Sequence, residues 1–215
     1  AATVANDLRA ALATRGVASL ALSGGNTPKR FLQALSLQSL PWKNVVATLV
    51  DERWVPESNE RSNARLMREN LLHGLAGEAR FLPLYRDTPE PEQALAAIER
   101  ELAALPSPFD AVVLGMGNDG HTASFFPGGD QLADALDPAT TARVLPMHAP
   151  DAGEPRITLT LPPILAARHL YLHIEGAAKM HVLEDAMTGN GAGAGYPMRS
   201  VLRHATSPVQ AFYSA

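Results

Sequence analysis

The sequence has 215 residues, of which 46% are hydrophobic, so it can bury one substantial core and we expect a single domain over residues 1–215. A formal net charge of -4 with scattered basic residues excludes a nucleic-acid footprint, and no apolar run approaches the roughly 20 residues that span a membrane. Cysteine is absent, which excludes disulfides, thiolate metal sites and a cysteine nucleophile and is typical of a cytoplasmic protein.

The first segments alternate between helix and strand. Apolar spacing predicts a helix over 3–14 and a buried strand over 17–22. The next segment, SGGNTP at 23–28, leads into a predicted helix from Pro28 to about Leu35, with Thr27 as its N-cap. Its two glycines allow the backbone N–H groups to curl inward around an anion. The segment therefore predicts phosphate binding, with an ordinary tight turn as the alternative.

A second buried strand is predicted over 45–50 and ends in the charged segment DERWVP at 51–56. Three charged residues directly after a strand indicate a site, although surface charge is the alternative. Ser62 and Asn63 can cap a helix that runs to about Leu72. A short apolar piece at 81–84 and a helix at 91–104 follow.

The central stretch is FDAVVLGMGNDGHTASFFP at 109–127. A strand over 110–114 is followed by Gly115 and Gly117, where the chain must turn tightly or let a group approach its backbone. We expect 122–126 to begin a helix, whose first N–H groups and dipole would favour an anion next to His121. The glycine spacing does not match a dinucleotide-binding fingerprint, and a Walker loop is absent.

The last third is predicted to contain strands, helices and connecting loops in alternation. The strands are expected at 143–146, 156–160, 169–174 and 209–215, the helices at 162–163 onward, 177–187 and 197–203, and loops at 148–155 and 189–195. Lys179 falls in the first turn of one of these helices, where a cation opposes the helix dipole. An anion nearby would account for it, with a solvated surface lysine as the alternative.

This alternation predicts an α/β fold with a mostly parallel, Rossmann-like sheet and helices on both faces. The segments 23–27, 51–53 and 115–121 would then follow the carboxyl ends of strands and face one cleft. Arg53, Arg156 and Lys179 are candidate cations for a small phosphorylated substrate. Histidine titrates near neutrality, so His121 is a candidate general base on water, with Asp119 or Asp51 orienting its ring.

Taken together, the segments at 23–28, 51–56, 115–127 and RITLT at 156–160 resemble the glucosamine-6-phosphate isomerase/6-phosphogluconolactonase family, and its lactonase branch in particular. The resemblance implies hydrolysis of a phosphorylated sugar lactone, 6-phosphogluconolactone of the pentose phosphate pathway, without a metal or other cofactor. It implies the fold that lactonases share with glucosamine-6-phosphate deaminases. The family usually has a strand before the first helix, so we expect that strand to be missing before Ala1.

The resemblance also implies roles for individual residues. It implies catalytic roles for His121, Asp51 and Arg53, and substrate-binding roles for Ser23, Gly24, Gly25, Thr27, Asn63, Asp119, Gly120, Arg156 and Lys179. A glucosamine-6-phosphate deaminase or sugar-phosphate isomerase is the nearest alternative, but the deaminase branch has a glutamate where this chain has Phe126. A non-catalytic sugar-phosphate-binding module is the other alternative. Besides the small phosphorylated lactone we expect no nucleic-acid or membrane partner, and a monomer or small homo-oligomer.

Overall fold

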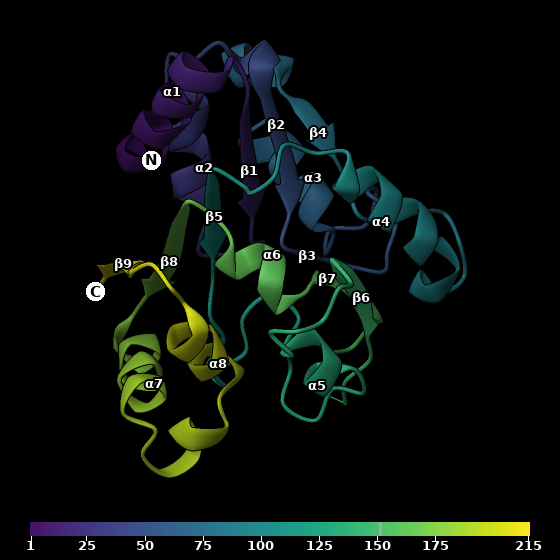
Figure 1. The fold of residues 1–215 in the computed structure, drawn as a ribbon, viewed down its shortest axis with the longest axis vertical. Helices are drawn as coiled ribbons and strands as arrows, with labels where there is room; N and C mark the ends of the chain where they lie inside the picture. Colours follow the sequence, from purple (N-terminus) through teal and green to yellow (C-terminus); the bar gives the residue numbers. More distant parts are fainter. Residues whose placement is uncertain (151) are drawn as a thin grey trace.

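A computed structural model describes residues 1–150 and 152–215 of the chain (Figure 1). Its helices and strands lie close to the predicted ranges in most places. Within the described residues the strands are β1 (Ala18–Leu22), β2 (Val45–Leu49), β3 (Asp51–Arg53), β4 (Arg80–Leu82), β5 (Ala111–Leu114), β6 (Val144–Met147), β7 (Arg156–Leu159), β8 (His169–Glu175) and β9 (Val209–Ser214). The α-helices are α1 (Ala2–Arg15), α2 (Lys29–Ser36), α3 (Asn63–Asn70), α4 (Leu95–Ala103), α5 (Leu132–Ala135), α6 (Leu161–Leu165), α7 (Ala177–Thr188) and α8 (Pro197–His204), and short 3-10 helices are η1 (Trp42–Asn44), η2 (Gly74–Glu78), η3 (Pro91–Ala94) and η4 (Gly191–Gly195).

Six strands form one parallel sheet in the order β4-β2-β1-β5-β8-β9, which confirms the predicted sheet type. All residues of β1, β2 and β5 are buried, as expected for inner strands covered on both faces. The chain builds the sheet outward from β1 through β2 to β4, and then returns to the other side of β1 with β5. The sheet therefore has a switch point between β1 and β5, where open α/β sheets bind ligands at the carboxyl ends of the strands.

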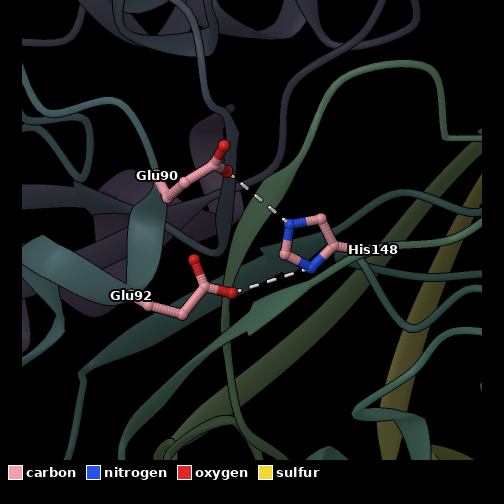
Figure 2. A group of neighbouring side chains, drawn as sticks. All are labelled: Glu90, Glu92 and His148. Atoms are coloured by element: carbon pink, nitrogen blue, oxygen red, sulfur yellow. Dashed lines mark ion pairs between the residues drawn. The ribbon is translucent and has the colours of Figure 1, made fainter.

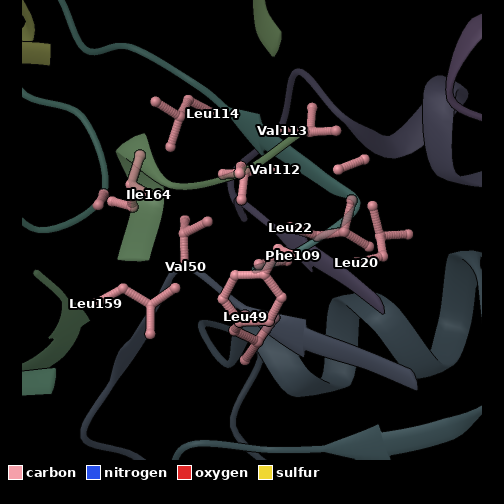
Figure 3. Close-up of a cluster of buried hydrophobic side chains, with 14 of the residues drawn as sticks. Leu20, Leu22, Leu49, Val50, Phe109, Val112, Val113, Leu114, Leu159 and Ile164 are labelled. Carbon is pink, nitrogen blue, oxygen red and sulfur yellow. The ribbon is translucent and has the colours of Figure 1, made fainter. Parts of the chain in front are cut away.

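The remaining strands form a second, antiparallel sheet in the order β3-β7-β6. In the β3–β7 pair Asp51 lies opposite Thr158 and Arg53 opposite Arg156. Figure 3 shows how the two sheets share one core, since Leu159 of β7 and Ile164 of α6 lie near the leucine and valine side chains of β1, β2 and β5. The short connection between β2 and β3 thus places the 51–53 segment on a separate layer beside the parallel sheet.

Six of the described α-helices pack as two groups that Figure 1 shows apart, while α4 and α5 pack against β6. Helix α1 packs against β1 and α2, and α2 packs against α3. In the C-terminal part of the chain, green to yellow in Figure 1, α7 packs against β8 and α8, and α8 packs against α6. The loops after β1 and β5 emerge between these groups.

Two local predictions are wrong. Residues 122–126 form turns instead of a helix, because Ala123 has a φ of 50° and the Thr122 hydroxyl donates a hydrogen bond to the carbonyl of Gly115 (2.8 Å). The helix N-terminus expected next to His121 is therefore replaced by a loop that continues to α5. Helix α2 has Pro28 rather than Thr27 at its N-cap.

The loop expected at 148–155 is irregular on both sides of Asp151, which lies outside the described residues.

Candidate active site

A cavity of about 170 Å³ opens at the switch point between β1 and β5. Its walls come from the loops after these two strands, from β3 and β7 of the small sheet, and from the first turns of α3 and α7. Ten of the predicted site residues line it, namely Ser23, Gly24, Gly25, Thr27, Asp51, Arg53, Asn63, His121, Arg156 and Lys179. Segments that are far apart in the sequence therefore meet in one cleft, as the parallel-sheet prediction required.

The imidazole of His121 is held by the carboxylate of Asp119. The Nδ1 atom lies 2.6 Å from Asp119 Oδ1, and the backbone N–H of His121 donates to the same oxygen at 3.2 Å. This contact assigns the proton to Nδ1, which leaves the lone pair of Nε2 for proton transfer. Both side chains are partly exposed. Burial raises the pKa of Asp119, but the hydrogen bond and charge of His121 outweigh it and lower that pKa below its usual value.

Gly117 explains how this pair fits against the backbone. A β-carbon on Gly117 would lie 2.3 Å from Nδ1 and Cε1 of His121 and 2.5 Å from Asp119 Oδ1. Backbone hydrogen bonds from Gly117 to His121 and from Gly120 to Gly117 close the turn. Sequence analysis predicted that a group approaches the backbone at Gly117, and in the structure this group is the side chain of His121.

The face of the His121 ring packs on Phe126. The two ring centroids lie 4.4 Å apart, and the guanidinium of Arg156 lies 5.2 Å from the centroid of the same phenyl ring. Phe126 is buried. The buried phenyl ring thus contacts both the imidazole of His121 and the guanidinium of Arg156.

Asp51 is a buried carboxylate in the cavity wall. The hydroxyl of Ser124 donates to Asp51 Oδ2 at 2.7 Å, and the backbone N–H of Ser124 donates to Thr158 Oγ1 at 3.3 Å. Ser124 is fully buried. Its contact with Asp51 joins residues that are 73 positions apart, so only the folded chain reveals it.

Two arginines lie beside Asp51. Arg156 is buried, and its guanidinium donates to the carbonyl of Ala152 at 2.6 Å. Burial lowers the pKa of Arg156, and the charge of Asp51 opposes this effect. Arg53 donates to the carbonyl of Arg61, while its buried Nε has no hydrogen-bond partner among the described residues. These cations make this wall of the cavity positive around a single carboxylate.

The opposite wall combines the glycine-rich loop with Lys179. Gly25 has a φ of 91°, a backbone conformation that few other residues adopt. Lys179 Nζ lies 3.5 Å from Thr27 Oγ1, at the edge of hydrogen-bonding distance. Backbone N–H groups and an ammonium thus adjoin in one corner, which suits a phosphate.

The structure differs from the predicted set at three residues. His173 also lines the cavity, and burial lowers its pKa, so that the neutral ring is favoured. Asp119 does not line the cavity; its carboxylate contacts Nδ1 of the His121 ring. Gly120, predicted to bind substrate, instead packs against Tyr196, whose ring would collide with a β-carbon at this position. A histidine on a strand and a serine outside a known motif carry little sequence signal, so both were missed.

Among residues 1–150 and 152–215, one group of possible metal ligands is found, and it lies apart from the cavity (Figure 2). Nε2 of His148 lies 4.0 Å from Glu90, and Nδ1 lies 3.7 Å from Glu92 and 3.2 Å from Asp130. A single ion can bind only one nitrogen of an imidazole ring. Glu90 and Glu92 face opposite nitrogens of this ring, so only one of them faces the nitrogen that such an ion would bind.

No helix within the described residues is long and apolar enough to cross a membrane.

Comparison with known proteins gives a consistent result. The sequence model of glucosamine-6-phosphate isomerases/6-phosphogluconolactonase matches residues 1–210. A 6-phosphogluconolactonase of Rhizobium meliloti is 52% identical over 207 residues, which cover 96% of this chain and 89% of that protein. A crystal structure of a 6-phosphogluconolactonase from Shewanella baltica superposes with a TM-score of 0.94 at 40% identity, covering 100% of this chain and 91% of the other.

A monomeric glucosamine-6-phosphate deaminase shares the fold alone, with a TM-score of 0.74 at 19% identity over 98% of this chain and 92% of the other. The family match spans nearly the whole chain, and the lactonase relatives are far more similar in sequence than this deaminase. The chain therefore belongs to the glucosamine-6-phosphate isomerase/6-phosphogluconolactonase family.

Proposed function

We propose that the chain hydrolyses 6-phospho-D-glucono-1,5-lactone to 6-phosphogluconate, a step of the pentose phosphate pathway. The observation that carries the proposal is the Asp119–His121 pair on a cavity that also presents a glycine-rich loop and three cations. The relatives that bear the name 6-phosphogluconolactonase support the same reaction.

In the proposed mechanism His121 is the general base. Its Nε2 takes a proton from water as the water oxygen attacks C1 of the lactone, and the carbonyl oxygen becomes an oxyanion. Asp119 stabilises the imidazolium that forms, because its carboxylate accepts the Nδ1–H. The imidazolium then returns the proton to the ring oxygen as the C1–O bond breaks. The histidine is neutral again at the end of the cycle.

The remaining groups bind and orient the substrate. Lys179 and the 23–27 loop would hold the phosphate, since they form one corner of the cavity. Arg53 and Arg156 lie on the other wall, where they could stabilise the oxyanion, and one such donor can contribute about 3–4 kcal/mol. Asp51 is placed to accept a hydrogen bond from a sugar hydroxyl.

The test is the hydrolysis of 6-phosphogluconolactone by the wild type and by His121→Ala, corrected for spontaneous opening of the lactone. We expect kcat to fall by about 10²–10⁴ in the variant, because the base is lost. Turnover should persist in the presence of a chelator, since the proposed mechanism uses no metal. A loss smaller than about tenfold would remove His121 from the role of base.

The assay also distinguishes a lactonase from a glucosamine-6-phosphate deaminase. A wild type without lactone turnover, but with release of ammonia from glucosamine 6-phosphate, would reverse the assignment. The phenyl ring of Phe126 on His121 argues against this outcome, because it gives the histidine an apolar neighbour where the deaminase branch supplies an acid.

A further inference from the structure

Glu52 is a charged residue that the proposed mechanism does not use. It is fully buried between two cavity residues of β3. Side chains alternate along a strand, so Asp51 and Arg53 point toward the cavity while Glu52 points to the opposite side. Its partner across the sheet is Ile157, a core residue. Because an unpaired carboxylate is costly to bury, its presence among apolar side chains calls for an explanation.

The carboxylate of Glu52 accepts hydrogen bonds from four donors. Oε1 accepts from the backbone N–H of Arg53 at 2.8 Å and of Asn63 at 2.7 Å. Oε2 accepts from the backbone N–H of Ala64 at 2.7 Å and from the Ser62 hydroxyl at 3.2 Å. Two of these donors are the first N–H groups of α3, which are left unpaired by the helix itself. Glu52 thus fastens the start of α3 to β3.

The junction between α3 and β3 positions three residues of the cavity wall, Asp51, Arg53 and Asn63. The side-chain amide of Asn63 donates to the carbonyl of Asp51 at 2.9 Å, and its Oδ1 lies against Gly24. A shift of α3 relative to β3 would therefore move Asn63 away from Asp51 and loosen its contact with the glycine-rich loop. Asp51 and Arg53 would lose their support from the same side.

We propose that Glu52 is a positioning residue for the lactonase reaction, acting through Asp51, Arg53 and Asn63 without touching the substrate. The proposal rests on the proposed function. A helix cap alone would stabilise the fold and leave the activity of each folded molecule unchanged, whereas a positioning residue alters that activity.

The experiment compares Glu52→Gln with Asp110→Asn. Asp110 is a matched control because it is also a buried carboxylate that accepts a backbone N–H, from Ser19 at 2.9 Å, and it pairs with Arg15 and Arg168 away from the cavity. In both variants an amide replaces a carboxylate oxygen with an NH₂ group, which cannot accept from a backbone N–H. Thermal unfolding, kcat and KM for 6-phosphogluconolactone at pH 8, and calorimetric binding of 6-phosphogluconate are measured for each.

Asp110→Asn should be less stable than the wild type, because the buried carboxylate loses its ion pairs with Arg15 and Arg168. Below both melting transitions, Glu52→Gln should lose about tenfold or more in kcat/KM, because small displacements of positioned groups have large effects on rate. It should also bind 6-phosphogluconate more weakly, while Asp110→Asn stays within about twofold of the wild type in both measurements. Wild-type values of kcat/KM and binding in folded Glu52→Gln would overturn the proposal.

Should Glu52→Gln fail to fold, Ser62→Ala removes one donor to the carboxylate and Ser62→Thr restores a hydroxyl. A loss of kcat/KM in the alanine variant that the threonine variant recovers supports the proposal, and wild-type activity of the alanine variant overturns it. Absence of turnover in the wild type would refute the proposed reaction instead. The binding of 6-phosphogluconate by the variants would still decide whether Glu52 positions the site.

Discussion

The side-chain amide of Asn63 occupies the space that a β-carbon on Gly24 would fill. An ideal β-carbon there would lie 1.8 Å from Asn63 Oδ1 and 2.1 Å from its Cγ. Asn63 is buried, and its Oδ1 has no hydrogen-bond partner among the described residues. The glycine-rich loop and the start of α3 can therefore approach this closely only because residue 24 lacks a side chain.

Gly24→Ala should displace either the loop or Asn63. We expect a fall of about tenfold or more in kcat/KM, since the phosphate corner and the Asp51 wall would both shift. Steady-state kinetics on 6-phosphogluconolactone measures the effect. Gly77→Ala is the control, because the nearest atom to its β-carbon would lie at 3.6 Å, an ordinary contact. Equal kinetics for the two variants would contradict this interpretation of the close approach.

Asp119→Asn should reduce kcat by about 10², because a neutral amide stabilises the imidazolium of His121 less and holds the ring less firmly. KM should change little if the pair acts on the chemical step. Asp130→Asn provides the control, since Asp130 contacts the ring and backbone N–H of His148 in the same manner outside the cavity. A mutant at position 119 with wild-type kcat would show that the carboxylate is dispensable.

Ser124→Ala should lower both stability and activity. It removes a buried hydrogen bond to the Asp51 carboxylate, and hydrogen bonds to charged groups contribute about 1.5–3 kcal/mol. Chemical denaturation measures the first effect and kcat the second. Ser36→Ala removes a hydroxyl that donates to the carbonyl of Gln33, a neutral group distant from the cavity, so it should cost about 1 kcal/mol and leave kcat unchanged. Unaltered kcat in Ser124→Ala would show that Asp51 keeps its geometry without this contact.

The stability of the protein should depend on the protonation of Glu52. Burial raises the pKa of Glu52 to about 7 against the opposing effect of the backbone N–H groups of Asn63, Ala64 and Arg53. The folded chain then binds this proton more tightly than the unfolded chain, whose pKa is 4.5. The stabilising contribution is complete below pH 4.5 and is lost as the pH rises to about 7.

The free energy of unfolding should therefore decline across this pH window more steeply in the wild type than in Glu52→Gln, which has no such proton. The difference should be about 3 kcal/mol at most, because one pKa unit corresponds to 1.36 kcal/mol. Urea denaturation at several pH values compares the two proteins. Parallel curves would mean that Glu52 keeps an ordinary pKa in the fold.

Strands β1 and β5, which flank the cavity, were predictable because each is a short apolar run that ends at a glycine-containing segment. The helix expected at 122–126 was wrong for a long-range reason. Thr122 bonds to Gly115, Ser124 bonds to Asp51, and Phe126 packs on His121, so contacts within the fold decide the backbone there. The preferences of the residues at 122–126 for helix or turn cannot predict these contacts, because the partners lie elsewhere in the sequence.

The second sheet was equally hidden from the sequence. The 51–53 segment carries three charged residues, and only its pairing with the alternating strand at 156–159 makes it a strand. Ten of the residues that the family resemblance named line the cavity, although the resemblance gave no reason for Gly117 or Ser124. Their importance follows from distances, which a single sequence does not supply.

The switch point between β1 and β5 also determines when during folding the chain can become active. The cavity takes residues from position 23 to position 179, contributed by both sheets and by α3 and α7. Most of these contacts are distant in sequence, and contacts of this kind form late because they require large loops to close. Activity therefore requires both sheets and the helices α3 and α7 to be in place at once. After dilution from denaturant, lactone turnover returns only when the whole cavity has formed. It therefore tests for the native state more stringently than circular dichroism, which detects helix content alone.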